Sequence, residues 1–562
     1  MKYNFNNNII ATLATIIAFP TIMIAQTHRI NQKDTTMNRT VVVENEYTPD
    51  IQDAQKINIL PQIDEPIAKS VQVEYSTKAN PVGTLPEGTI ELFQKKENQP
   101  DDTPGILRVG YGNKSNTDIL GNYLFNLSDN DKLNLNFNFN GMNGDLDPVN
   151  GDTYRKWDAF YFRTNAAANY THNFQQMDFD AASHFGLSNF NYKPNTLKNK
   201  QKFTSGDIHL GIHSTDETLK LLYRAETNLM FYQRQHNFFT DKSFNETLIR
   251  TKATITKPMM NEQQIAVTIK LNNYIYSATG LDNYTSAQFN PFYELDRDNV
   301  KIHLGVHADF STGVGNNVLL APDMTIQFIP VKEFVVYGKA TGGKTLNDFR
   351  KMEQLCPYGD YPESIDAAHT NDRQMKDTYN QIDASAGFKT SPIPGIWFHL
   401  YAGYQNLKND IFCIQETEVA PITYGVFEQA KTNNTYVGAE FKYNYRELIT
   451  FSASGIYRNW DSPNEYALIM KTALQFTANA SAYITPALFI NLGYNHESRV
   501  KTTTEYGRRN PINNLHLEAN YKFYKGISFY ARANNLLDKD YEYYLMYPTE
   551  GLNFVGGMIF KF

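Results

Sequence analysis

One pattern constrains the fold of this chain more than any other: segments in which apolar and polar residues alternate strictly. Residues 132–140 show it most clearly, with Leu or Phe at every odd position from 133 to 139 and Asn at the even positions from 134 to 140. The alternation returns in 219–226, 264–272 and 515–523. Because successive side chains of a strand point to opposite faces, each segment predicts a strand with one apolar and one polar face. Lipid outside and water inside a barrel explain this pattern over many strands, whereas a soluble sandwich seldom keeps it at this length.

Residues 552–562 form another such segment and end on Phe562. Every second residue is apolar or glycine, and the opposite face is mixed. The segment resembles the closing strand of Gram-negative outer-membrane barrels, whose assembly machinery recognises a terminal aromatic residue. A soluble β-sandwich that ends on a strand is the alternative. The residues predicted to form the assembly signal are Phe554, Met558, Phe560 and Phe562.

Composition narrows the class of protein. The aromatic share of the 562 residues is 14%, mainly Tyr and Phe, while the mean hydropathy is −0.49. Strands with one aromatic and aliphatic face and one polar face give a chain that is rich in aromatic residues and polar on average. The formal net charge of −7, without a basic stripe, argues against nucleic acid as a partner, because phosphates need clustered Lys and Arg. No run beyond the N-terminal region is long enough for a membrane helix, and a barrel needs none.

The sequence predicts three regions. Residues 1–25 are expected to be a secretory signal peptide, because an apolar run that ends at Ala25 follows Lys2. An uncleaved anchor is the alternative. Residues 26–104 are polar and interrupted by prolines, so we expect an extended periplasmic or luminal segment that acts as a partial stopper of the lumen. Residues 105–562 are the predicted barrel.

Connections between the predicted strands alternate between tight turns and longer polar loops. If every tight turn and both termini lie on the periplasmic side, the chain has about 22 strands, an even number as a closed barrel requires. The longest loop is 345–375. The predicted fold class is therefore all-β, a transmembrane antiparallel β-barrel with a short extended N-terminal segment, integral to the Gram-negative outer membrane.

Particular residues give a resemblance to the barrel of TonB-dependent receptors. Residues 534–541, Asn-Asn-Leu-Leu-Asp-Lys-Asp-Tyr, followed by Tyr547-Pro548, resemble the penultimate strand and last outer loop of the family. Residues 435–440, Thr-Tyr-Val-Gly-Ala-Glu, resemble a family strand with a Gly-x-Glu core. The resemblance covers 105–562, and no standard plug domain is recognised before it.

Within the extension, Thr40, Val41, Val42 and Val43 resemble the TonB box, through which such receptors recruit a periplasmic protein by strand addition. A local strand or sheet edge is the alternative. The resemblance implies outer-membrane lipid, the barrel assembly machinery, TonB or another periplasmic protein, and a surface lipoprotein as partners.

Candidate site residues lie on the predicted inner faces and on the exterior side. His303, His307 and Asp309 share one face and could touch a metal or polar ligand, but alternate strand positions lie roughly 7 Å apart. We interpret them as wet lumen residues and assign no metal and no cofactor. Cys356 and Cys413 both fall outside the cell, where we predict a disulfide, with two unpaired thiols as the alternative. The polar residues predicted to face the lumen are Lys220, Arg224, Glu226, Lys270, His303, His307, Asp309, His516, Glu518 and Lys522.

Motifs of enzymatic chemistry are absent from the sequence. We find no Gly-x-Ser-x-Gly, phosphate-binding loop, His-Glu-x-x-His or Cys-x-x-Cys, so we expect no enzyme. The predicted function is uptake or passage of a polar solute through a TonB-dependent-receptor-like barrel. The alternative is a structural or assembly subunit of an outer-membrane protein complex, with the barrel as its anchor.

Overall fold

The structure is a computed structural model that describes part of the chain. It describes residues 103–562 except 148–155, 194–199, 217, 237–242, 261, 278–280, 316–317, 361–373, 417–423, 447 and 505–508. The predicted signal peptide, the extension up to residue 102 and the TonB-box-like residues 40–43 lie outside the described residues. Among the described residues, no helix is long and apolar enough to cross a membrane.

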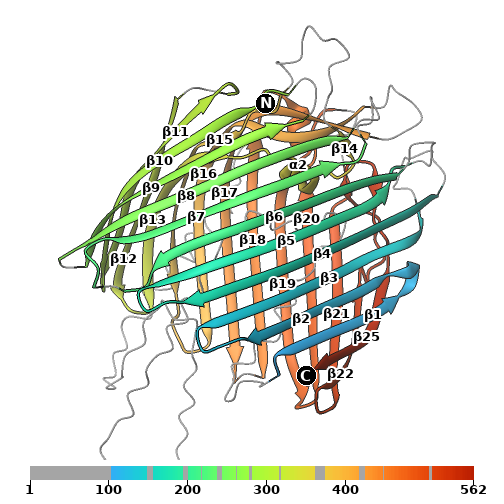
Figure 1. Cartoon of the computed structure of the whole chain (residues 1–562). Coiled ribbons are helices and arrows are strands. Elements are labelled where there is room, and N and C mark those ends of the chain that lie inside the picture. The colour runs from blue at the N-terminus through green and yellow to red at the C-terminus, as the bar shows by residue number, and fades with distance from the viewer. Residues whose placement is uncertain are drawn as a thin grey trace, which may run out of the picture.

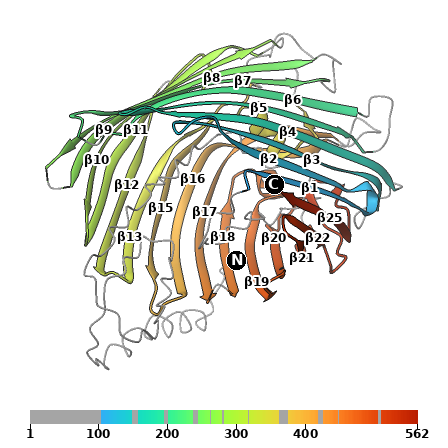
Figure 2. The ribbon, with the colours of Figure 1, turned by 60° about the horizontal axis from the view of Figure 1, so that its bottom comes forward.

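The described chain forms a closed antiparallel β-barrel of 22 strands (Figure 1). Neighbouring strands in the wall are neighbours in sequence, and β1 closes the cylinder by pairing with β25. Figure 2 shows the same ring of strands with the lower end turned toward the viewer. The predicted all-β class and the count of about 22 strands are confirmed.

The first half of the wall consists of β1 (Gly105–Gly112), β2 (Thr117–Asn126), β3 (Asp131–Leu146), β4 (Trp157–Asn173), β5 (Met177–Asn191), β6 (Lys200–Ser214), β7 (Leu222–Arg234), β8 (Phe244–Met259), β9 (Gln263–Tyr276), β10 (Tyr284–Arg297) and β11 (Val300–Thr312). The second half consists of β12 (Val318–Val331), β13 (Phe334–Thr345), β15 (Thr378–Thr390), β16 (Ile396–Glu416), β17 (Tyr424–Tyr445), β18 (Ile449–Asp461), β19 (Thr472–Thr485), β20 (Leu488–Arg499), β21 (Ile512–Tyr524), β22 (Ile527–Asn534) and β25 (Asn553–Lys561). Short elements outside the wall are η2 (Asn113–Ser115), α2 (Phe349–Leu355), β14 (Gly359–Asp360), η4 (Glu465–Leu468), β23 (Glu542–Tyr544) and β24 (Tyr547–Pro548).

The two faces of the wall follow the alternation in the sequence. On β3, Phe137 is 42% exposed, whereas Asn140 is buried. On β25, Phe554 is 54% exposed, whereas the adjacent Val555 is buried. Exposed apolar side chains recur on one face from strand to strand and form a surface suited to lipid. The barrel is therefore an integral outer-membrane protein in architecture, as predicted.

Tight turns and long loops occupy opposite ends of the barrel. Both Gly105 and the C-terminus lie at the tight-turn end (Figure 1), which this architecture places in the periplasm. The strand expected from residue 219 begins at Leu222. The Asp216 carboxylate accepts hydrogen bonds from the backbone and hydroxyl of Thr218, which turns the chain. Lys220 therefore lies in a tight turn and not on an inner strand face, which corrects its predicted position.

The seam between β1 and β25 is closed at its periplasmic end by the last residue. Phe562 and Gly105 exchange two backbone hydrogen bonds, 2.8 and 3.0 Å long. On the inner side, the buried Asp118 of β2 accepts a 2.9 Å hydrogen bond from Arg108 of β1 and a 2.8 Å bond from the Tyr530 hydroxyl of β22. The Tyr530 bond crosses the seam and joins strands from both ends of the chain.

Candidate functional site

The outer end of the lumen is filled by the chain itself. We call residues 346–360 and 541–549 together the outer closure. The first segment carries α2 and β14, and the second carries β23 and β24. Figure 1 shows α2 and β14 close to the long-loop end, behind the strands in front. The closure is the candidate functional site, because any solute that passes through the barrel must pass it.

A local sequence signal explains α2. Asp348 caps the helix by accepting a 2.8 Å hydrogen bond from the backbone N–H of Lys351. Phe349, Met352 and Cys356 follow at spacings of three and four residues, which place them on one face of the chain as it coils. All three are buried in the same apolar cluster. The helix thus turns an apolar face toward the inner wall.

Arg350 and Glu353 attach α2 to the wall at β4–β7. The Arg350 guanidinium lies 3.3 Å from the Asp207 carboxylate on β6 and donates hydrogen bonds of 2.7 and 3.1 Å to the carbonyls of residues 206 and 231. Glu353 lies 3.4 Å from Arg163 on β4 and accepts a 3.1 Å hydrogen bond from Ser188 on β5. These charge-assisted contacts are polar and reversible.

The two ends of the long loop are held at the wall of β8–β10. The backbone N–H of Phe349 donates a 3.1 Å hydrogen bond to Glu246 on β8. At the other end, the buried Asp377 carboxylate accepts hydrogen bonds from the backbone N–H of Asn347 and from the hydroxyls of Tyr274 and Tyr284. Residues 347–349 and Asp377 are therefore anchored at the same part of the wall.

The far side of segment 346–360 attaches to β16 and β17. Gly359 and Asp360 of β14 pair in parallel with Gly425 and Val426 of β17. The wall itself is antiparallel, so β14 is an added strand and not part of it. Segment 346–360 consequently bridges the lumen from β4–β8 to β16–β17.

Aromatic side chains join the two parts of the closure. The rings of Tyr358 and Tyr547 stack with centroids 3.5 Å apart, and Trp157 of β4 meets Tyr547 edge-on at 5.4 Å. Phe190 of β5 meets Tyr358 edge-on at 5.3 Å. The inner face of a transmembrane barrel is ordinarily polar. A buried aromatic cluster at this place indicates that the outer end of the wall is shaped to hold the closure.

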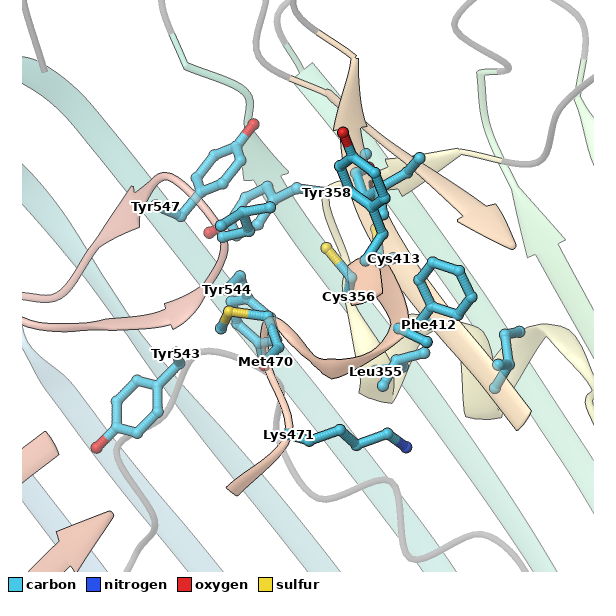
Figure 3. Close-up of a pocket in the computed structure, with 16 residues that line it drawn as sticks. Leu355, Cys356, Tyr358, Phe412, Cys413, Met470, Lys471, Tyr543, Tyr544 and Tyr547 are labelled. Atoms are coloured by element: carbon cyan, nitrogen blue, oxygen red, sulfur yellow. Dashed lines mark hydrogen bonds between the residues drawn. The ribbon is translucent and has the colours of Figure 1, made fainter. Parts of the chain in front are cut away.

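A pocket that is partly open to solvent lies beside this cluster. Figure 3 shows its lining, with Cys356 and Cys413 at one side and Tyr543, Tyr544 and Met470 at another. The Lys471 ammonium at its edge lies 2.6 Å from the Asp410 carboxylate. The lining is mainly apolar, with one paired cation. Its full set is Leu355, Cys356, Tyr358, Ile411, Phe412, Cys413, Ile414, Gly425, Tyr466, Ala467, Met470, Lys471, Tyr543, Tyr544, Leu545 and Tyr547.

Burial shifts the pKa values of groups in and beside the closure. It raises the pKa of the Glu353 carboxyl despite the opposing effect of Arg163. It likewise raises the pKa of Asp377, against the hydrogen bond from the backbone of Asn347. Burial lowers the pKa of the Lys351 ammonium, against the attraction of Asp348. Each shift reflects the cost of holding a charge in a dry site.

Below the closure, the inner wall is polar. Arg224 and Glu226 share the face of β7 that carries buried Met230, and Glu226 pairs with Lys252 of β8 at 3.5 Å. Other predicted residues on strands are Lys270 of β9 and the set His516, Glu518 and Lys522 of β21, of which His516 and Glu518 are buried and Lys522 is exposed. Their role as lumen-facing groups stays a prediction.

His303 and His307 meet acidic residues of neighbouring strands. His303 lies 2.8 Å from Glu294 on β10 and 3.1 Å from Asp323 on β12, and His307 lies 3.5 Å from Asp323. Asp309 accepts a 2.9 Å hydrogen bond from Gln288. Among the described residues, no group of three or more His, Cys, Asp or Glu side chains could hold a metal ion. These side chains form a hydrogen-bonded network across β10, β11 and β12.

Cys356 and Cys413 come together in the closure, and both are free cysteines in the structure. The predicted assembly residues Phe554, Met558 and Phe560 lie on β25, and Phe562 follows it. Their part in assembly stays a prediction.

The prediction of an outer loop over 345–375 missed the insertion of residues 346–360 into the lumen. The available signal was a capping Asp followed by apolar residues at helical spacing, Phe349, Met352 and Cys356. It also missed β23 and β24, where a dense group of tyrosines marks the contact.

The chain matches no protein-family model, and no curated protein matches it. Solved structures do resemble it. The siderophore receptor PirA from Acinetobacter baumannii has 11% identity and a TM-score of 0.60 over 83% of this chain and 81% of that chain. The FrpB iron transporter from Neisseria meningitidis, F5-1 variant, has 11% identity and a TM-score of 0.62 over 82% of each chain. The copper transporter OprC has 10% identity and a TM-score of 0.59 over 82% of this chain and 80% of that chain.

These similarities define the class of protein by its fold: a large outer-membrane barrel of the TonB-dependent receptor type. The resemblance predicted from the sequence is confirmed at that level. At such low identity, the likeness concerns the fold alone.

Proposed function

We propose that the barrel passes a polar solute across the outer membrane through a lumen whose outer end opens and closes. One observation carries the proposal: a dry closure fills the outer end, while the wall below it is lined by charged and hydrogen-bonding side chains. Segment 346–360 is held at β4–β8 by ion pairs and hydrogen bonds, which can be released without breaking the wall. A gate above a polar lumen suits transport.

The solute is expected to be polar, because residues predicted to face the lumen carry charge, such as Glu226, which pairs with Lys252. The similar barrels named above include iron and copper transporters and a siderophore receptor, which supports uptake as the direction of transport. We propose that residues 26–104 act as the inner stopper and that a TonB-type protein binds Thr40–Val43 by strand addition. The sequence supports this second part.

Single-channel conductance in a planar bilayer tests the proposal. Four forms are compared: the mature protein, a form without 26–104, a form without 346–377, and a form without both. Thr345 and Thr378 are cross-strand partners, so a short hairpin turn can rejoin β13 and β15 without moving either strand. Resistance of the barrel to SDS before heating controls for folding in every form.

We expect no large pore in the mature protein and the largest pore in the double deletion. If the mature protein conducts strongly, passive diffusion replaces gated transport. If the folded double deletion does not conduct, transport is wrong, and the structural or assembly subunit becomes the better account. In that case, partner proteins should be sought by cross-linking in intact outer membranes.

A further inference from the structure

Two cysteines from distant parts of the chain meet inside the outer closure. Cys356 directly follows α2 in segment 346–360, and Cys413 lies in the outer part of β16. They are the only cysteines among the 562 residues. Within one chain, each can pair only with the other. Figure 3 shows both side chains at the same side of the cavity.

The thiols are neighbours and not merely members of one region. Both cysteines line the same pocket beside the aromatic cluster. Cys356 is buried in the apolar cluster that holds Tyr358 and Phe427, and Cys413, which is partly buried, packs against this cluster. Two thiols that lie among aromatic and aliphatic groups gain little from staying reduced, since a thiol is a weak hydrogen-bond donor.

Two glycines make room for the sulfur of Cys413. A Cβ atom added at Gly425 would lie 2.3 Å from Cys413 Sγ, and one added at Gly359 would lie 3.1 Å from it. Gly359 belongs to β14 and Gly425 to β17, which pair with each other. The parallel pairing of β14 therefore brings the chain beyond Cys356 against the wall at the place where Cys413 lies.

We propose that Cys356 and Cys413 form a disulfide that fixes segment 346–360 to β16, so that the closure can release only from the β4–β8 side. The disulfide would attach segment 346–360 covalently to β16. The contacts of Arg350 and Glu353 attach the same segment reversibly to the opposite part of the wall. The disulfide itself does not depend on the proposed function, whereas its meaning as a hinge rests on it.

The chemistry balances with an exported thiol oxidant. Two S–H bonds break and one S–S bond forms, and two protons and two electrons leave the protein. The electrons pass to the disulfide of a periplasmic dithiol–disulfide oxidase: one cysteine thiolate attacks that disulfide, and the other cysteine then displaces the oxidase from the mixed disulfide. Because Cys356 is buried once segment 346–360 is docked, this exchange must precede docking.

The first test is peptide mapping of the full-length protein from outer membranes, denatured in the presence of an alkylating reagent. We expect a cross-linked peptide containing Cys356 and Cys413, lighter by two hydrogen atoms than the two free peptides, and no alkylation before reduction. Alkylation of both cysteines without prior reduction would overturn the proposal. Peptide mapping does not depend on conductance, so the disulfide can be confirmed even if the proposed transport function is wrong.

The second test measures hydrogen exchange of the backbone amides of 346–360. Reduction of the wild-type protein, or the double variant Cys356→Ser/Cys413→Ser, should quicken exchange about thirtyfold, the low end of what a disulfide contributes. The single variants Cys356→Ser and Cys413→Ser should match the double variant. Unchanged exchange after verified reduction would overturn the hinge. Chemical reduction keeps the test decisive if a serine variant does not fold.

Discussion

The inner wall of the barrel has two regions with different chemistry: an outer end that contacts the closure and a polar part below it. Toward the outer end, Trp157 and Tyr161 are buried in the apolar cluster of the closure, and Arg163 pairs with Glu353 of α2. Below the closure, Glu226 of β7 pairs instead with Lys252 of β8. A barrel interior tolerates apolar side chains only where something dry covers them. Apolar residues on an inner face therefore indicate the places where the chain fills its own lumen.

The two regions should also respond differently to mutation. Loss of a contact in the polar wall should weaken the barrel and leave the closure in place. Loss of a contact in the closure should open the outer end and leave the barrel intact.

The largest effect is expected from Asp118→Ala at the seam. The change leaves Arg108 and Tyr530 without this buried carboxylate and should lower the free energy of unfolding by about 5 kcal/mol, the upper range for breaking a buried ion pair. Urea titration of the folded, SDS-resistant band measures it. Lys522→Ala, at an exposed position, is the control and should change little. Faster exchange of 346–360 in Asp118→Ala would contradict the separation of wall from closure.

Tyr358→Ala should loosen the closure by about 4 kcal/mol, because it removes a buried ring from the centre of the aromatic cluster. Hydrogen exchange of 346–360 should quicken, and conductance should rise in a form that lacks 26–104. The matched control Tyr358→Phe keeps the stacked ring. An equal effect in both variants would show that the ring stack is not what holds the closure.

Lys471→Met should have a smaller effect, about 2 kcal/mol, since the Asp410 carboxylate keeps a 2.7 Å hydrogen bond from Thr432. The expected result is local loosening around η4, measured by protease cleavage of the β18–β19 connection. Cleavage within 346–360 should stay unchanged. If it increased, the cavity edge would belong to the gate.

The smallest effect is a pH dependence of closure. The pKa of Glu353 is raised when α2 is docked, so docking is favoured at pH below the ordinary carboxyl pKa and weakens as pH rises through the raised value. Asp377 acts in the same direction, and Lys351, with its lowered pKa, opposes this only at more alkaline pH. Protease cleavage within 346–360 should therefore increase from acidic to neutral pH. Glu353→Gln should reduce the dependence, and an undiminished one would assign it to Asp377.

Local alternation made most of the wall predictable. The Leu and Phe residues of 132–140 point outward because a strand with period two has no other way to separate them from the asparagines. The tight turns follow from the same segments. Lys220 was misplaced because Leu219 and Leu221 continue the alternation into a turn that Asp216 sets by a side-chain hydrogen bond.

The closure could not be predicted in the same way. Its contacts join α2 to β4, β6 and β8, more than a hundred residues earlier in the chain, and no local period encodes such partners. The cysteine pairing was expected from compartment and topology. Cys356 and Cys413 lie close together because β14 pairs in parallel with β17, and a strand of two residues carries no sequence pattern that predicts this pairing.

The paired backbones of Gly105 and Phe562 also bear on the order of events in folding. A wall whose first and last strands are partners has two unsatisfied edges until β25 arrives, and an open edge can pair with any other extended chain. Nearly every other pairing in the wall is between consecutive strands and can form early, whereas this one spans the whole described chain. Cylinder closure is thus expected late in folding, and both edges need protection until then.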